Sequence, residues 1–245
     1  RAEAEGGADA ILDLNVIDPA CGSGHFLLGA ARRMATRVAQ LRNPDAPDYN
    51  AAMRDVVRNC IHGVDRNPMA IELAKVALWI ESVEPGKPLG FLDANIQCGD
   101  SLLGVFDLKA LEEGIPDDAY KPLTGDDKDT ANGLKRLNRS ERDAGLLRRA
   151  IAPEKLVERF DKFHAMPETS LTEINAKAKS FAAIKGDPDW WPLRVACDAY
   201  IAAFLLPKPK TASSVDKVLV PTTRQVREAL DHRPPQGPLA VAIDS

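Results

Sequence analysis

The sequence predicts an α/β fold in which a parallel sheet is followed by a mostly helical region. Three short strand-like runs, at 15–17, 61–64 and 95–98, are separated by helical patterns. This alternation is expected when parallel strands are joined by helical crossovers. Each run ends in a polar residue beside Gly or Pro, whereas beyond Leu108 strand-like runs give way to long helical patterns.

The composition indicates a globular protein with a sizeable core, because 44% of the 245 residues are hydrophobic. No uninterrupted apolar run of ~18 residues occurs and residues 1–15 lack a secretion signal, so we expect a cytoplasmic protein. The four cysteines form no C-x-x-C pair, which argues against a zinc site or disulfides and favours buried, reduced thiols. Because the chain begins with Arg, we expect it to be a fragment.

The distribution of charge along the chain is more informative than the net charge. A net charge of −4 does not favour a stand-alone nucleic-acid-binding protein, since neutralising phosphates needs a surplus of Lys and Arg. An acidic stretch at 107–129 is followed by a basic helical stretch at 135–159. A solvated helix face and a DNA contact both remain open for the basic stretch.

Helical periodicity defines the segments between the predicted strands. Helix 24–41 places an apolar stripe on one face, formed by Leu27, Ala31, Met34, Val38 and Leu41. The sequence NPDAPDYN breaks this helix, and a second helix is expected to run to about residue 59. Helix 69–80 is apolar nearly all round, so we expect it to be buried between the sheet and another element.

The region after residue 107 is predicted to be a separate part of the chain. Residues 110–133 are rich in Gly, Pro and Asp and predict a loop or linker. Helices are expected near 138–151, 153–165, 169–184, 193–206 and 222–231. The sequence PLAVAI at 238–243 predicts a further strand. The expected domains are thus 1–107, a helical insertion at 108–237 that begins with the acidic linker, and a returning strand at 238–245.

The three strand ends predict a binding site, because ligands of parallel sheets lie at the carboxyl ends of the strands. The groups there are Asp18 with a glycine turn, Asp65 and Asp100. The turn is not a dinucleotide motif, since Leu27 stands where a third glycine is needed, nor a phosphate loop, since His25 follows Gly24. The remaining candidate for this site is a ligand with an amino-acid end and a nucleoside end.

In this interpretation Asp18 balances a cationic amino or sulfonium group, and Asp65 accepts hydrogen bonds from two ribose hydroxyls. Each carboxylate has an alternative structural role. Asp18 is also suited to a turn, and Asp65 is also suited to cap the helix that begins at Pro68.

Three segments resemble motifs of a known enzyme family. DPACGSGHFLL at 18–28 resembles the S-adenosylmethionine (SAM) motif of the amino-methylating DNA methyltransferases. GVDRNPMAIELAKVALWI at 63–80 and QCGDSLLG at 97–104 resemble the second and third motifs, in the same order. The resemblance is closest to large bacterial adenine-N6 DNA methylases of restriction and phage-defence systems. It implies a partial Rossmann-like SAM methyltransferase sheet followed by a helical insertion.

The resemblance also implies a role for each motif residue. Asp18 and the turn after it would hold the methionine part of SAM, with Phe26 packing beside it. Asp65 would bind the ribose, and Arg66 would lie along the adenine. Asp100 would accept a hydrogen bond from the adenine amino group. The implied cofactor-binding set is Asp18, Pro19, Ala20, Cys21, Gly22, Ser23, Gly24, Phe26, Asp65, Arg66, Asp100, Ser101 and Leu102.

The family's catalytic element is an Asn/Asp-Pro-Pro-aromatic loop that binds the extruded base. The single Pro-Pro pair here, Pro234–Pro235, is preceded by Arg233 and followed by Gln236, so it offers neither acceptor nor ring. We therefore expect a chain that ends before the catalytic loop and contains no catalytic residue or metal site, its DNA contacts coming from the full-length protein. An unpaired edge of strand 15–17 would promote self-association. Methylation of cytosine N4, RNA or protein, and a non-catalytic helical interaction module, remain alternatives.

Overall fold

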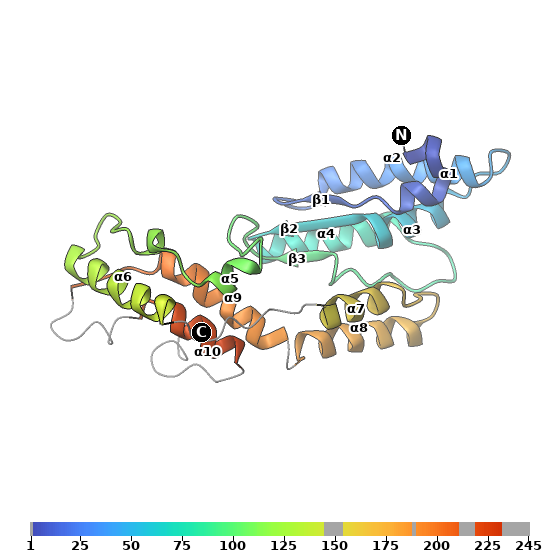
Figure 1. Cartoon of the computed structure of the whole chain (residues 1–245). Helices are drawn as coiled ribbons and strands as arrows, with labels where there is room; N and C mark the ends of the chain where they lie inside the picture. Colours follow the sequence, from blue (N-terminus) through green and yellow to red (C-terminus); the bar gives the residue numbers. More distant parts are fainter. Residues whose placement is uncertain (1, 145–153, 188–189, 211–218, 232–245) are drawn as a thin grey trace. The chain divides into compact units, whose positions relative to one another are not determined.

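The structure is a computed structural model that describes residues 2–144, 154–187, 190–210 and 219–231. The chain divides into two compact units, coloured along the sequence in Figure 1. The first unit comprises the residues up to Leu102 together with Arg159–Ala183. The second comprises Leu103–Glu158 together with the residues from Ile184 onward. Each unit has its own hydrophobic core.

The first unit contains a three-stranded sheet in the order β1-β2-β3, with all strands parallel (Figure 1). The strands are β1 (Val16–Asp18), β2 (Ile61–Asp65) and β3 (Ile96–Cys98). The predicted α/β class and parallel pairing are confirmed, and the predicted strand positions are correct to within one residue at each end. The chain is otherwise mostly helical.

Four helices precede or connect these strands: α1 (Ala2–Leu12), α2 (His25–Arg42), α3 (Tyr49–Cys60) and α4 (Pro68–Glu81). Helix α2 packs against β1 and β2, and α4 packs against β2 and β3. Because both crossovers advance in the same direction across the sheet, they place α2 and α4 on the same face, where the two helices contact each other. Helix α1, which the sequence analysis did not predict, packs on α2 and α3.

The predicted core face of α2 is largely correct. Leu27, Ala31 and Val38 are buried, while Met34 and Leu41 are partly buried and pack against the same core. The break after α2 occurs where the Asn-Pro and Ala-Pro pairs predict it. Helix α3 begins beyond it at Tyr49, with the Asp48 side chain accepting the Ala51 N–H at 3.0 Å.

Helix α4 departs from the prediction that it would be buried between the sheet and another element. Its inner face buries Ile71, Ala74 and Leu78. Met69 and Ile80 on the outer face are 66% and 70% exposed. In the sequence, apolar residues occur on every face of this helix. Among the described residues, the sheet covers only one of these faces.

The outer strand β1 is also partly uncovered. Among the described strands, β1 pairs on one side only, and Ile17 is 65% exposed. Strands of a parallel sheet are usually covered on both faces of the sheet, and inner strands are paired on both edges. The segment 238–243, which we expected to return as a strand, lies outside the described residues.

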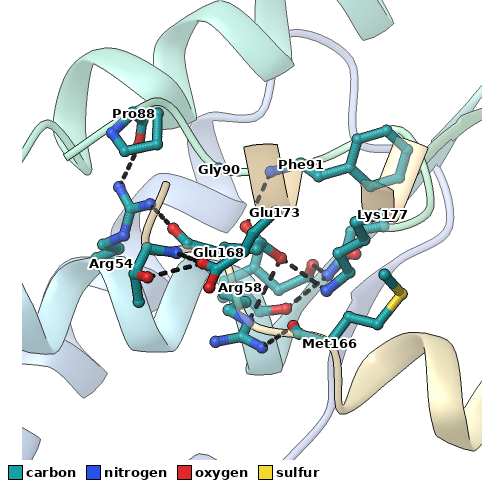
Figure 2. Close-up of polar contacts among 12 residues, drawn as sticks. Arg54, Arg58, Pro88, Gly90, Phe91, Met166, Glu168, Glu173 and Lys177 are labelled. Atoms are coloured by element: carbon teal, nitrogen blue, oxygen red, sulfur yellow. Dashed lines mark hydrogen bonds and ion pairs between the residues drawn. The ribbon is translucent and has the colours of Figure 1, made fainter. Parts of the chain in front are cut away.

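A segment of the expected helical insertion belongs to the first unit and is held there by a buried polar network (Figure 2). Glu168 accepts a hydrogen bond from Lys177 Nζ at 2.6 Å and from the Phe91 N–H at 3.0 Å. Arg54 of α3 donates to the Glu168 carbonyl at 2.6 Å, and Arg58 Nε lies 3.4 Å from the Glu168 carboxylate. Charges this deep are stable only when they are paired.

An aromatic cluster lies beside this network. The rings of Phe91, Phe163 and Phe181 lie within 6.0 Å of one another, centroid to centroid. Lys177 Nζ lies 5.0 Å from the centroid of Phe163. Burial lowers the pKa of Lys177, whereas its hydrogen bond to Glu168 acts in the opposite direction. The side chains concerned lie on or between α7 (Glu154–His164) and α8 (Leu171–Lys185), apart from Phe91.

The second unit is helical in its described part. It contains α5 (Lys109–Glu113), the 3-10 helix η1 (Asp117–Tyr120), α6 (Lys128–Asp143), α9 (Trp190–Leu205) and α10 (Thr223–Leu230). The sequence-based prediction of a loop or linker at 110–133 is wrong, because this stretch forms α5, η1 and the start of α6. Leu111, Ile115 and Tyr120 are buried in the core of the unit.

Three buried residues explain why this stretch is ordered. Asn138 donates to the Ile115 carbonyl at 2.7 Å and accepts the Thr223 N–H at 2.8 Å. Thr223 Oγ1 in turn accepts the Ile115 N–H at 3.0 Å. The network joins segments about a hundred residues apart, so local composition could not reveal it.

The acidic and basic stretches meet in this unit. Asp117 pairs with Arg139, Arg142 and Lys135 of α6. The hydrogen bond from Arg139 is the main cause that lowers the pKa of Asp117. Part of the basic stretch therefore holds η1 against α6, and a DNA contact by its remaining charge stays a prediction.

Three further expectations concern the cysteines, membrane-spanning helices and metal sites. Cys21 and Cys60 are buried free thiols, but Cys98 is exposed and Cys197 is half-buried, so burial was correctly predicted for only two of them. Within the described ranges, no helix has the length and apolar character needed to span a membrane. No group of three or more His, Cys, Asp or Glu side chains in those ranges is arranged to hold a metal ion.

Candidate functional site at the strand ends

The turn after β1 depends on two glycines in left-handed conformations. Gly22 has a φ of 52° and Gly24 a φ of 84°, values that side chains with a Cβ rarely adopt. A Cβ on Gly24 would lie 3.1 Å from the Cβ of Ala74, so α2 and α4 approach closely there. A Cβ on Gly22 would meet no atom within 4 Å. The backbone at Gly22 therefore borders open space.

The same turn is fastened to β2 through Cys21. The Cys21 N–H donates to the Val64 carbonyl at 2.9 Å, which extends the sheet pairing beyond β1. A Cβ on Gly63 would lie 2.9 Å from Cys21 Sγ and 2.7 Å from Leu27 Cδ1, so a larger residue beneath the turn would force these side chains to shift. Burial raises the pKa of the Cys21 thiol, and the carboxylates of Asp18 and Asp65 raise it further.

Asp65 lies at the end of β2 and connects this strand to the turn. Its Oδ2 accepts the Gly22 N–H at 2.9 Å, and its Oδ1 accepts the Asn67 N–H at 2.8 Å. The Asn67 bond, followed by the Gly22 bond, lowers the pKa of Asp65, so the carboxylate is ionised at neutral pH. Each carboxylate oxygen has further acceptor capacity, which leaves room for two hydroxyl donors.

The structure also decides which residue caps α4. The side chain of Asn67 accepts the Met69 N–H at 3.0 Å and Asn67 occupies the N-cap position. The alternative in which Asp65 caps this helix is therefore wrong. Asp18, in contrast, does act as a turn residue, because its Oδ1 accepts the Ala20 N–H at 3.0 Å.

The end of β3 brings the third motif to the first. Ser101 Oγ donates to the Pro19 carbonyl at 2.7 Å. Asp100 Oδ1 accepts the Leu102 N–H at 3.0 Å, and its Oδ2 lies 3.4 Å from Arg66 Nε. The structure thus joins the ends of all three strands by direct contacts, with Asp100 and Arg66 paired to each other.

Large apolar side chains of the predicted set lie at the surface. Phe26 is 84% exposed and Leu102 is 85% exposed. Exposed aromatic or aliphatic side chains beside a polar turn are suited to pack against a ligand.

His25 is a residue of this site that the sequence analysis did not include. It is exposed at the first position of α2, and its Nδ1 lies 3.1 Å from Ser23 Oγ. Its place directly after Gly24 is the signal that marks it, since residues at this position border the turn.

Comparison with known proteins shows a similarity to DNA methyltransferases. The DNA-methyltransferase domain of MmeI matches residues 7–87. A Methanocaldococcus jannaschii protein named "Putative type II restriction enzyme and methyltransferase RM.MjaORFECS2P" is 31% identical over 111 residues, covering 40% of this chain and 9% of the relative. "Adenine-specific methyltransferase PglX" of Streptomyces coelicolor is 38% identical over 71 residues, covering 29% of this chain and 6% of the relative.

The chain thus spans less than a tenth of the length of either of these relatives. No solved structure gives a significant match. The matched region contains β1, the glycine turn, β2 and α4, which build two of the three strand ends of the site, whereas β3 and Asp100 lie beyond it. Through this region, the chain is similar to DNA methyltransferases.

Proposed function

We propose that the strand-end site binds SAM and that the chain is the cofactor-binding part of a DNA adenine-N6 methyltransferase of a restriction-modification or phage-defence system. The observation that carries the proposal is the position of Asp65. This ionised carboxylate is fixed by two backbone N–H groups beside a glycine turn that borders open space. A ribose diol has two hydroxyl donors, and the carboxylate of Asp65 can accept two further hydrogen bonds.

The residues present fit a ligand that is extended along the strand ends. With the ribose at Asp65 on the central strand β2, the adenine lies towards Asp100 on β3 and the methionine part towards Asp18 on β1. In this pose Asp100 would accept a hydrogen bond from the adenine amino group, and Arg66, now paired with Asp100, would either leave that carboxylate or cover the adenine ring. The exposed side chains of Phe26 and Leu102 would shield the two ends of the ligand from water. Bound SAM supplies a sulfonium methyl group for transfer.

Adenine N6 in DNA is the favoured acceptor because one relative is named an adenine-specific methyltransferase and the other a restriction enzyme and methyltransferase. A Rossmann-like sheet and a cytoplasmic location form part of the same proposal. DNA recognition and the acceptor loop are assigned to the full-length protein.

Calorimetric titration of the chain with SAM and with S-adenosylhomocysteine tests the proposal. Wild type should bind both ligands. Asp65→Ala should weaken binding about tenfold or more, since a hydrogen bond to a charged group contributes about 1.5–3 kcal/mol. Asp45→Ala is the matched control, because Asp45 is an exposed carboxylate in the connection between α2 and α3. Absence of binding by wild type, or equal affinities of wild type and Asp65→Ala, would refute the proposal.

A further inference from the structure

We propose that His25 binds the carboxylate of the methionine part of SAM and so makes the site selective for ligands that carry this group. The inference rests on the proposed function and adds a residue and a selectivity to it. Three observations support it: the order of the strands, the exposure of His25 and its contact with Ser23.

The order of the strands sets the direction of the ligand. Asp100, Asp65 and Asp18 follow β3, β2 and β1, which are neighbours in that order. A ligand with its adenine near Asp100 and its ribose near Asp65 therefore extends its amino-acid end towards the turn after β1. This turn has Asp18 at its start, and His25 follows immediately after its end.

The amino-acid end carries two opposite charges. Asp18 provides a carboxylate for the ammonium group. A partner for the ligand carboxylate must be a donor, and His25 is the first residue after the turn with a side chain able to be cationic. Within the predicted cofactor-binding set, the basic side chain is that of Arg66, which lies at the adenine end and pairs with Asp100.

The contact with Ser23 orients the imidazole. Ser23 Oγ lies 3.1 Å from His25 Nδ1, which holds this nitrogen against the turn. When Ser23 donates this bond, the neutral ring carries its proton on Nε2, which is then free to donate to the ligand. When the ring is protonated, both nitrogens donate. In these two forms Nε2 presents an N–H that can donate to a carboxylate bound at the turn, whereas the neutral form with its proton on Nδ1 donates to Ser23 instead.

The test compares two ligands that differ only in this carboxylate: SAM and decarboxylated SAM. Both keep the sulfonium, the amine and the adenosine. Wild type should bind SAM about tenfold or more tightly than decarboxylated SAM, as expected for one hydrogen bond to a charged carboxylate. His25→Ala should remove most of this preference by weakening SAM binding, while its affinity for decarboxylated SAM should match wild type.

Two further variants complete the design. His25→Gln places an amide donor near the position of Nε2 and should restore part of the preference. Arg33→Ala removes an exposed cation further along α2 and should leave both affinities unchanged, which controls for general electrostatics.

The outcomes separate the two proposals. Equal weakening of both ligands by His25→Ala, or no weakening of either, would overturn the role of His25 while wild-type binding of SAM still supports the proposed function. Failure of wild type to bind either ligand would overturn both. The thermal unfolding midpoint of each variant is measured first, and the two affinities are compared only for variants that unfold at the wild-type temperature, so equal weakening is not attributed to unfolding.

Discussion

Asp65 Oδ2 lies 2.9 Å from the backbone nitrogen of Gly22, so the end of β2 holds the turn that follows β1. The two residues are 43 positions apart in the sequence. The ionised carboxylate of Asp65 holds the turn in place and can still accept hydrogen bonds from a ligand. The stability of the turn therefore depends on the charge of Asp65.

Asp65→Asn should make the stability of the chain less dependent on pH in the acid range. The pKa of Asp65 is lowered in the folded state by the N–H groups of Asn67 and Gly22, below an unfolded value of about 3.9. Its stabilising contribution is therefore present above pH ~4 and is lost as pH falls through the folded pKa. Urea unfolding from pH 7 to pH 3 should show the difference between wild type and variant shrinking below pH ~4. A constant difference would contradict this prediction.

Gly63→Ala should destabilise the first unit by about 1–3 kcal/mol, because the added methyl overpacks a filled core. It would lie 2.7 Å from Leu27 Cδ1 and 2.9 Å from Cys21 Sγ. Gly29→Ala is the opposite case: Gly29 is helical, a Cβ there meets no atom within 4 Å, and the change should stabilise by up to about 1 kcal/mol. Thermal unfolding of the two variants checks the sign, and stabilisation by Gly63→Ala would be inconsistent with the packing described.

Glu168→Gln should cost about 3–5 kcal/mol, because Lys177 and Arg58 would lose their buried counter-charge. The double variant Glu168→Gln with Lys177→Met should lose less than the sum of the single variants. Glu158→Gln, at an exposed position of α7, serves as the control. Urea titration measures wild type, both single variants, the double variant and the control, and additive losses would show that the pair does not act as a unit.

The chain should self-associate through β1 where segment 238–243 does not pair with this strand. Among the described strands this strand has one paired edge, and Ile17 is 65% exposed. Ile17→Lys should favour the monomer, since lysine on an edge strand opposes pairing between edges. Sedimentation velocity over a range of concentrations distinguishes the two proteins. A wild-type chain that is monomeric at every concentration would exclude this contact.

The chain alone should not methylate DNA. Its sequence contains no Asn/Asp-Pro-Pro-aromatic loop, which supplies the acceptors for the target amino group in the family that it resembles. The assay is incorporation of a radiolabelled methyl group from SAM into duplex DNA that contains adenine. Incorporation that Asp18→Ala abolishes would reveal a catalytic group outside this motif.

The sequence by itself determined the elements whose signals are local. A strand run followed by Asp-Pro and two glycines specifies strand, turn and helix, because Gly22 and Gly24 adopt φ values that exclude most other residues. The spacing of Leu27, Ala31 and Val38 likewise identifies the buried face of α2 without knowledge of its neighbours. The parallel pairing followed from the crossovers alone.

The tertiary structure decided what depends on partners distant in the sequence. The composition of 110–133 predicted a linker, but Ile115 is held by Asn138 and Thr223 in the core of the second unit. Glu168 joins its segment to the first unit through Arg54 and Lys177, which no periodicity connects. Asn67 rather than Asp65 caps α4, because Asp65 is engaged with Gly22 on a neighbouring strand end. Buried polar groups must be paired, and only the folded chain shows which partners are within reach.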